Sequence, residues 1–236
     1  MLEKDFKNAY IVISTWFGIA YEILEKLLNI GFSREKIFWF PPLPLGDEQY
    51  FGLDFINFSD NEIYVDVGCF DGYTIEKFIQ FCGGKYKKIY GMEPDPINFD
   101  ITKKCITNKG FENVALIAKG AWSKEDILSF SNNASGSSKI SSEGVIKVPV
   151  TSIDEMVGDD AVTFIKMDIE GTELEALKGA VKTISRNKPK LAICVYHNAI
   201  DILEIPIFID SLISDYKYYL RHHTNSYPET VLYAVP

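Results

Sequence analysis

Two short apolar runs each end in side chains that could carry out acid–base chemistry. Val162–Met167 is followed by Asp168 and Glu170, and Leu191–Tyr196 is followed by His197. Runs of this length and composition predict buried strands. Because the carboxyl ends of parallel strands meet at one edge of a sheet, we expect the three side chains to lie together there. An imidazole titrates near neutrality, so His197 is the best candidate to accept a proton at that edge.

Each of the three residues also has a structural interpretation. A single histidine is more often a hydrogen-bonded structural residue, and Glu170 could be a solvated turn residue. Asp168 follows the strand more directly, and a carboxylate buried there without a function would be costly. The sequence therefore predicts His197, Asp168 and Glu170 as catalytic residues. Together they could hold a metal, but their spacing is not diagnostic, and we predict no metal site.

A glycine loop marks a second candidate site. Glu62–Val67 reads as a strand, Gly68 and Gly72 lie in the loop after it, and apolar residues at helical spacing begin at Ile75. Strand, glycine loop and helix form the entry unit of a nucleotide-binding α/β domain. The dinucleotide pattern G-x-G-x-x-G is absent, because Asp66 stands at the first glycine position. A carboxylate there would repel a diphosphate and would suit a cationic ligand such as S-adenosylmethionine.

The next strand supplies a candidate for binding ribose. Lys88–Met92 predicts that strand, and Glu93 follows it at the tip. This fold places a carboxylate there, and its two oxygens can accept both ribose hydroxyls. Asp95 can instead cap the next helix, whose first turn suits Pro96. Glu93 is therefore the functional candidate and Asp95 the structural one.

The third strand, Val114–Ala118, leads to Gly120, Ala121 and Trp122, where an adenine could lie against backbone and apolar surface. Packing in the core explains Trp122 equally well. The loop could also be a tight strand-to-helix turn with Asp71 as the helix cap. The full set of predicted cofactor-binding residues is Asp66, Gly68, Asp71, Gly72, Thr74, Glu93, Ala121 and Asp168.

Residues 1–45 predict a small unit of their own. Ala9–Ile13 and Ile37–Phe40 read as strands, with a helix between them that ends at Gly31. One β-α-β unit is too small to bury both faces of its strands. It could serve in recognition or dimerisation, but we favour a structural extension. Pro41–Gly46 predicts a stiff linker to a main domain at residues 55–236.

Several further elements complete the main domain. Thr172 and Glu175 match a capping box, followed by one apolar helical face. Ser131–Gly144 reads as an exposed loop between two extra strands. Near the end of the chain, Lys217–His223 and Thr230–Val235 predict a closing strand pair. A long closing hairpin is typical of Rossmann-like methyltransferases and not of dehydrogenases.

Composition narrows the classes of partner. The chain has 236 residues and a net charge of −9, so it has no basic excess to neutralise a nucleic-acid backbone. Its four cysteines show no C-x-x-C spacing and read as reduced intracellular thiols. We find neither a transmembrane segment nor a secretory signal, and we predict a cytoplasmic protein.

The ordered set of motifs resembles the FkbM-type family of S-adenosylmethionine-dependent methyltransferases. The resemblance covers residues from about 62 to 235. It rests on four segments: Val65–Gly72, Met92–Pro94, Phe164–Glu173 and Leu177–Ala180. It implies an α/β, Rossmann-like class I fold with a seven-stranded, mainly parallel sheet whose last strand is antiparallel. The end of the chain and His197 are similar to a subgroup often found with bacterial polysaccharide genes.

The resemblance implies O-methylation of a sugar, a polysaccharide precursor or a related small molecule, with S-adenosylmethionine as cofactor. We expect a small-molecule or glycan acceptor and a possible homodimer. Two other functions stay open. A nicotinamide-dependent oxidoreductase is disfavoured by Asp66 in place of the first glycine. A non-catalytic interaction module would keep the fold without the activity.

Overall fold

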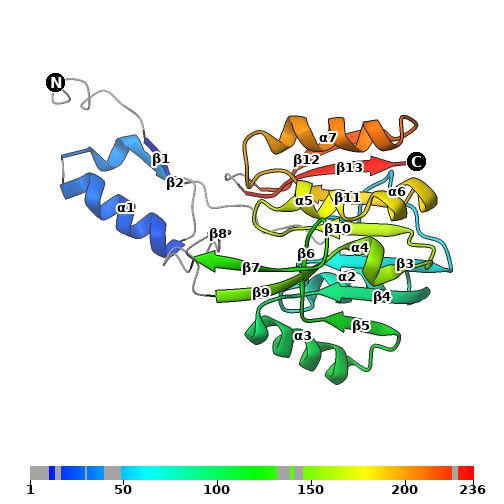
Figure 1. Ribbon diagram of the computed structural model, residues 1–236. Helices are drawn as coiled ribbons and strands as arrows, with labels where there is room; N and C mark the ends of the chain where they lie inside the picture. The colour runs from blue at the N-terminus through cyan, green and yellow to red at the C-terminus, as the bar shows by residue number, and fades with distance from the viewer. Residues whose placement is uncertain are drawn as a thin grey trace. The chain divides into compact units, whose positions relative to one another are not determined.

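The computed structural model describes residues 11–13, 17–29, 31–39, 49–131, 139–140, 146–224 and 228–236 (Figure 1). The chain divides into two compact units. Residues 1–46 and 222–229 form the smaller one, and residues 47–221 and 230–236 form the larger. Among the helices of the described segments, none is both long enough and apolar enough to cross a membrane.

The smaller unit contains the predicted β-α-β arrangement. Its strands β1 (Ile11–Ile13) and β2 (Ile37–Trp39) pair in parallel, and α1 (Phe17–Asn29) and the short helix η2 (Arg34–Lys36) connect them. Ile37 is buried among partly buried apolar side chains of the same unit. The predicted linker at Pro41–Gly46 lies outside the described residues.

The larger unit is built on the predicted seven-stranded sheet. Its strand order is β12-β13-β11-β10-β3-β4-β5. The pairs from β11 to β5 are parallel, and β13 runs antiparallel to β11. The Rossmann-like sheet with an antiparallel last strand is therefore confirmed. The strands are β3 (Glu62–Val67), β4 (Tyr86–Met92), β5 (Val114–Ile117), β10 (Phe164–Met167), β11 (Lys190–Cys194), β12 (Lys217–His222) and β13 (Thr230–Val235).

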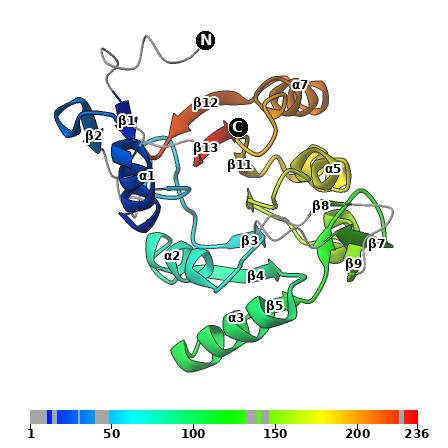
Figure 2. The same ribbon diagram turned by 90° about the vertical axis from the view of Figure 1, so that its left-hand side faces the viewer.

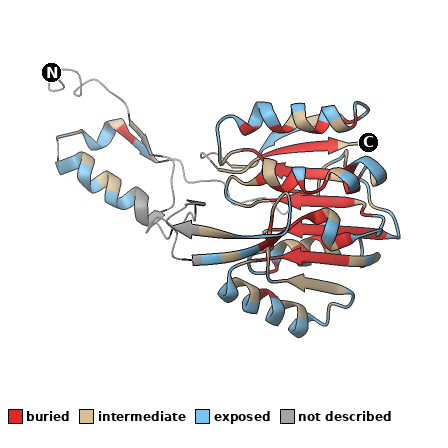
Figure 3. Cartoon of the chain, viewed as in Figure 1, coloured by how far each residue is buried: buried red, intermediate tan, exposed pale blue. Residues whose placement is uncertain are grey.

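Helices cover both faces of this sheet (Figure 2). One face carries α2 (Tyr73–Phe81) and α3 (Pro96–Lys109). The other carries α4 (Ile153–Val157), α5 (Glu173–Lys178), α6 (Val181–Asn187) and α7 (Asp201–Leu212). Successive strand residues face opposite sides of the sheet. Tyr64 therefore belongs to the core beneath α2 and α3, and Val65 to the core beneath α4 to α7. The central strands are buried on both faces, as expected for a parallel sheet (Figure 3).

An aromatic segment before β3 also belongs to the larger unit. Phe51 is 2% exposed, and its ring lies 5.7 Å from that of Phe78 and 5.5 Å from that of Phe164. Tyr50 is buried in the same core. The predicted start of the main domain at residue 55 is thus too late, because these aromatic side chains fill the core beside α2.

The two predicted extra strands are present in a second sheet. Its order is β6 (Gly120–Ala121), β9 (Ile146–Thr151), β7 (Asp126–Ser131) and β8 (Lys139–Ile140). The short strand β8 lies within the segment predicted as an exposed loop and pairs with β7. The other residues between β7 and β9 lie outside the described ones.

The helix after β10 differs from its prediction in two ways. It is broken into α5 and α6 at Gly179, where an added Cβ would lie 2.0 Å from the Trp122 carbonyl oxygen. The capping box is also wrong. The Thr172 hydroxyl donates to the Ile169 carbonyl, and Glu175 pairs with Lys178 on the surface. Glu173, not Glu175, is the acid that accepts a backbone amide at this turn, from Ile169.

Candidate active site

The structure brings together the three predicted catalytic residues. Strands β10 and β11 are parallel neighbours, with Met167 opposite Ile193, so the chain segments after them leave the same edge of the sheet. His197 Nε2 lies 3.5 Å from Asp168 Oδ1 and 3.7 Å from Glu170 Oε2. The side chains differ in exposure: His197 is 9% exposed, Asp168 26% and Glu170 62%. The group therefore extends from the protein interior to the solvent.

A tight turn after β10 directs Glu170 outward. Glu170 and Gly171 both adopt positive φ angles, 59° and 95°. The side-chain amide of Asn198 donates from Nδ2 to the Gly171 carbonyl at 2.9 Å and to Asp201 Oδ2 at 3.0 Å. The segment after His197 therefore holds the turn in place.

Glu173 is a third acidic residue of the group, and the sequence analysis did not predict its role. Its side chain is fully buried, and Oε1 accepts the Ile169 amide at 3.0 Å. The same oxygen lies 2.9 Å from His197 Nδ1, although the approach departs from the direction of a ring N–H bond. Burial lowers the pKa of His197, but Glu173, followed by Asp168 and Glu170, outweighs it, so the pKa is raised.

Two tyrosines hold Asp168. The Tyr196 hydroxyl donates to Oδ1 at 3.1 Å, and the Tyr50 hydroxyl donates to Oδ2 at 3.3 Å. Tyr196 directly precedes His197 and follows β11, so its position next to a predicted site residue was a signal in the sequence for a role at this site. Nothing near Tyr50 in the sequence signals its position, because it reaches Asp168 from a distant part of the chain.

Distances alone would admit a cation here. Within the described part of the chain, Asp168, Glu173 and His197 each offer one donor atom, and these atoms lie within 4.8 Å of one another. Both oxygens of Asp168 already accept tyrosine hydroxyls, and Glu173 Oε1 accepts a backbone amide. Each carboxylate keeps acceptor positions beyond these hydrogen bonds, and the absence of a metal site stays a prediction.

Asp66 is enclosed at the tip of β3. It lies opposite Lys166 on β10, and Lys166 Nζ lies 3.2 Å from Asp66 Oδ1. Nζ also donates to the Gly68 carbonyl at 2.7 Å, and the Thr74 hydroxyl donates to Asp66 Oδ2. We expected this carboxylate to suit a cationic ligand. The structure shows instead a buried ion pair that fixes the shape of the loop.

The loop itself depends on Gly68. Its φ angle is 79°, and an added Cβ would lie 2.1 Å from the Asp168 carbonyl oxygen. No side chain fits in that space. The loop backbone and the start of the Asp168–Gly171 turn are therefore in direct contact.

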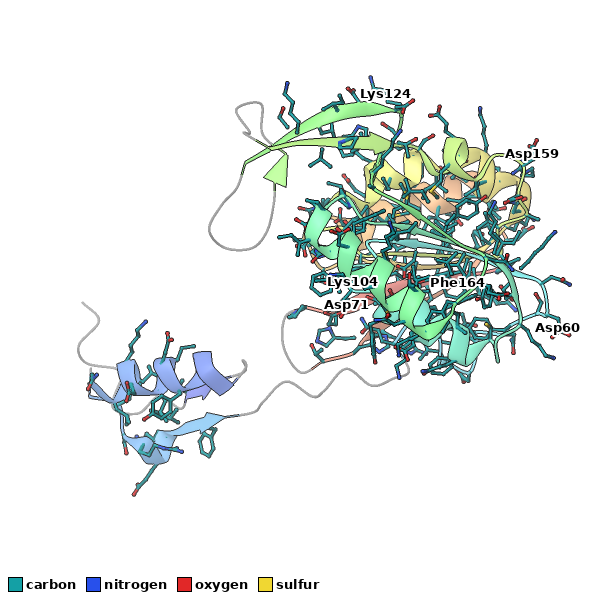
Figure 4. The ribbon with its side chains drawn as sticks, turned by 90° about the horizontal axis from the view of Figure 1, so that it is seen from below. Asp60, Asp71, Lys104, Lys124, Asp159 and Phe164 are labelled. Carbon is teal, nitrogen blue, oxygen red and sulfur yellow. The ribbon has the colours of Figure 1, made fainter. Side chains whose placement is uncertain are left out.

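Asp71 and Gly72 form the start of α2. Asp71 Oδ1 accepts the Tyr73 amide at 2.9 Å, and Gly72 precedes the helix with a φ of 85°. An added Cβ on Gly72 would meet side chains of Thr102 and Cys105 on α3 at 3.3–3.4 Å. Figure 4 shows Asp71 beside that helix. These residues place the amide end of α2 at the carboxyl edge of the sheet.

Glu93 faces the same loop from the tip of β4. It is 6% exposed, Oε2 accepts the Phe70 amide at 3.0 Å, and Oε1 accepts the Asp95 amide at 3.0 Å. Burial raises the pKa of Glu93, and the two amides oppose the rise. A carboxylate has about four acceptor positions, so two remain for a ligand. Asp95 caps α3 as predicted, since Oδ1 accepts the amides of Ile97 and Asn98.

Ala121 is buried in β6 and pairs with Thr151 of β9. The Trp122 amide donates to the Thr151 carbonyl at 2.9 Å. An added Cβ on Gly120 would lie 3.9 Å from the Pro94 side chain. The segment after β5 is therefore next to the turn that carries Glu93.

Comparisons with known proteins agree on the class of protein. The family model "Methyltransferase FkbM domain" matches residues 66–224, more than half of the chain. The hexuronic acid methyltransferase AglP of Haloferax volcanii is 28% identical over 146 residues, which are 59% of this chain and 58% of that protein.

Solved structures give a similar result. A methyltransferase FkbM from Methylobacillus flagellatus is 35% identical with a TM-score of 0.68, over 80% of this chain and 47% of that one. An rRNA methylase from Streptococcus thermophilus is 17% identical with a TM-score of 0.50, over 75% of this chain and 87% of that one, and it supports the fold alone. The chain thus spans about half the length of the Haloferax volcanii and Methylobacillus flagellatus proteins.

Proposed function

The chain belongs to the FkbM family of methyltransferases, and from that premise we propose that it transfers a methyl group from S-adenosylmethionine to a hydroxyl of a sugar or polysaccharide precursor. One observation carries the proposal: His197 and Asp168 lie together at the edge of the sheet where the Gly68 loop also ends. The sugar class is supported by the hexuronic acid methyltransferase among the relatives.

In this proposal the cofactor lies along the carboxyl ends of β3, β4 and β5. The two free acceptor positions of Glu93 bind the ribose hydroxyls, and the amide end of α2 near Asp71 and Gly72 faces the polar end of the ligand. Asp66 and Thr74 act indirectly by holding the loop. The adenine lies toward Ala121, and Asp168 borders the cationic centre.

S-adenosylmethionine, when bound, supplies an electrophilic methyl group on a sulfonium. The protein's part is to align an acceptor hydroxyl with that methyl group and to keep water out. His197 Nε2 faces Asp168 and the exposed side chain of Glu170. We assign it the acceptor proton: the O–H bond would break and an N–H bond would form at Nε2, while the oxygen would gain the methyl group as the methyl–sulfur bond breaks and its electron pair stays on sulfur. Asp168 stabilises the resulting imidazolium.

Two measurements test the proposal. Isothermal titration with S-adenosylhomocysteine and with NAD should give binding heat for the first and none for the second. A screen with methyl-labelled cofactor against hydroxylated sugars and glycolipid precursors should then identify the acceptor class. Heat for NAD alone would refute the cofactor assignment. Cofactor binding without transfer to any acceptor in the panel would favour a non-catalytic module.

A further inference from the structure

A fully buried carboxylate lies behind the proposed base. Glu173 is 0% exposed, and Oε1 lies 2.9 Å from His197 Nδ1. It is anchored there, because the same oxygen accepts the Ile169 amide at 3.0 Å. Enclosing a carboxylate is unfavourable unless it has a charged or hydrogen-bonding partner. The partners that the structure supplies are this amide and the imidazole ring.

The arrangement makes the two ring nitrogens of His197 different. Both nitrogens are buried, but Nδ1 faces the buried Glu173, and Nε2 faces Asp168 and the exposed Glu170. Glu173 is the nearest and most buried of these carboxylates, so we infer that it attracts the hydrogen of the neutral ring to Nδ1, although the contact is not aligned as a hydrogen bond. The lone pair is then on Nε2, the nitrogen that faces the turn after β10.

We propose that Glu173 is a positioning residue for methyl transfer, holding His197 in the orientation and tautomer that leave Nε2 free to take the acceptor proton. The inference rests on the proposed role of His197 as the base. During the step, Nε2 gains the proton from the acceptor hydroxyl, and Glu173 stabilises the imidazolium from its other side. The proton passes to solvent after the methylated product leaves.

Four acidic groups surround His197, and they are not equivalent. Asp168 is hydrogen-bonded to two tyrosines, Glu170 is 62% exposed, and Asp201 on α7 accepts the Asn198 amide. Solvent weakens the effect of Glu170 on the ring. Glu173 alone among them is fully buried and within contact distance of a ring nitrogen. The raised pKa of His197 agrees with this, since Glu173 is the largest of the influences that raise it.

The test compares two Glu-to-Gln variants on the same helix. Glu173→Gln keeps the shape and removes the charge behind His197. Glu175→Gln is the matched control, because Glu175 is partly exposed and pairs with Lys178 on the surface. Turnover of Glu173→Gln should fall roughly 10–100-fold, with the acceptor KM and cofactor affinity within a few-fold of wild type. The control should keep wild-type turnover.

A second measurement does not depend on turnover. NMR titration of labelled histidine, with the His197 signal assigned by its absence in His197→Ala, should give a wild-type pKa above the ordinary 6.5 and a lower pKa in Glu173→Gln. An unchanged pKa in a folded Glu173→Gln would overturn the inference even if turnover fell. If that variant does not fold, a wild-type pKa at or below 6.5 would overturn it.

Two controls separate this inference from its alternatives. Loss of wild-type turnover in chelator with recovery on adding Mg²⁺ or Mn²⁺ would also overturn it, because the cluster would then hold a cation. Unchanged turnover in chelator supports it. If no acceptor is methylated, the proposed function fails, but the titration still shows whether Glu173 controls His197.

Discussion

Two neighbouring strand tips of this sheet manage buried charge in opposite ways. At the tip of β3, the carboxylate of Asp66 is balanced by the ammonium of Lys166, and both side chains are almost fully buried. After β10, the carboxylates of Asp168, Glu170 and Glu173 all lie within 3.7 Å of one imidazole. In the first arrangement the two charges balance, and the ion pair fixes a backbone loop. The second has an excess of acid and can change its protonation, which is a feature of functional sites.

The balance at the first tip keeps Lys166 charged. Burial alone would lower the pKa of Lys166, but the nearby carboxylates of Asp66 and Asp168 raise it. Its ammonium also donates to the Gly68 carbonyl. The two tips therefore differ in role: the paired tip provides shape, and the acidic tip provides the proposed chemistry.

The largest effect should come from the acidic tip. His197→Ala should lower turnover by roughly 10²–10⁴, because general-base assistance is lost, while cofactor affinity stays within a few-fold. Steady-state methyl transfer and isothermal titration measure the two quantities. Asp168→Ala, the comparison variant, should weaken both. Near-normal turnover in His197→Ala would make the histidine structural and leave the step to Glu170 or to substrate positioning.

The paired tip should respond in stability. Lys166→Met leaves Asp66 buried without its partner, which should lower the free energy of unfolding by about 3–5 kcal/mol. Urea denaturation gives this value. Lys178→Met, which removes an exposed pair with Glu175, should cost about 1 kcal/mol or less. Equal losses in the two variants would show that the buried pair has no special part in the loop.

Glu93 shares a property with each tip: it is buried like Asp66, and it keeps acceptor positions for a ligand. Glu93→Ala should weaken cofactor binding at least ~100-fold, since two charge-assisted bonds of about 1.5–3 kcal/mol each are lost. Some stability should be lost too, because Glu93 also accepts the amides of Phe70 and Asp95. Asp95→Ala should affect the α3 cap and leave affinity almost unchanged. An unaltered dissociation constant in Glu93→Ala would place the ribose elsewhere.

The smallest effect is a dependence on pH. Because the pKa of His197 is raised in the folded protein, its ionised form adds stability below the ordinary 6.5, and this is lost as pH rises through the raised value. Turnover should change in the opposite direction and rise over the same interval, since the base must be neutral. Unfolding and rate measurements across pH should show both trends in wild type. His197→Ala should lack the stability trend, and its presence there would assign it to another group.

Much of the fold could be predicted because apolar runs and glycine loops are local signals. The meeting of Asp168 and His197 followed from one rule about parallel strands, and the structure brings them together. Glu173 was missed because the pattern Thr172–Glu175 indicated a different capping acid. Lys166 was missed because its partner Asp66 is opposite it on another strand, and no short-range pattern gives strand register.

The close contact at Gly68 restricts which residues of this site can change during evolution. With no room for a Cβ beside the Asp168 carbonyl, backbone atoms set the spacing between the Gly68 loop and the segment that follows β10. Any substitution at Gly68 would have to move both. Glu170, only two residues beyond Asp168, is 62% exposed and carries no such restriction. Under the proposed function, selection for a new acceptor can therefore act on exposed side chains such as Glu170, while the backbone contact that would align the transfer stays unchanged.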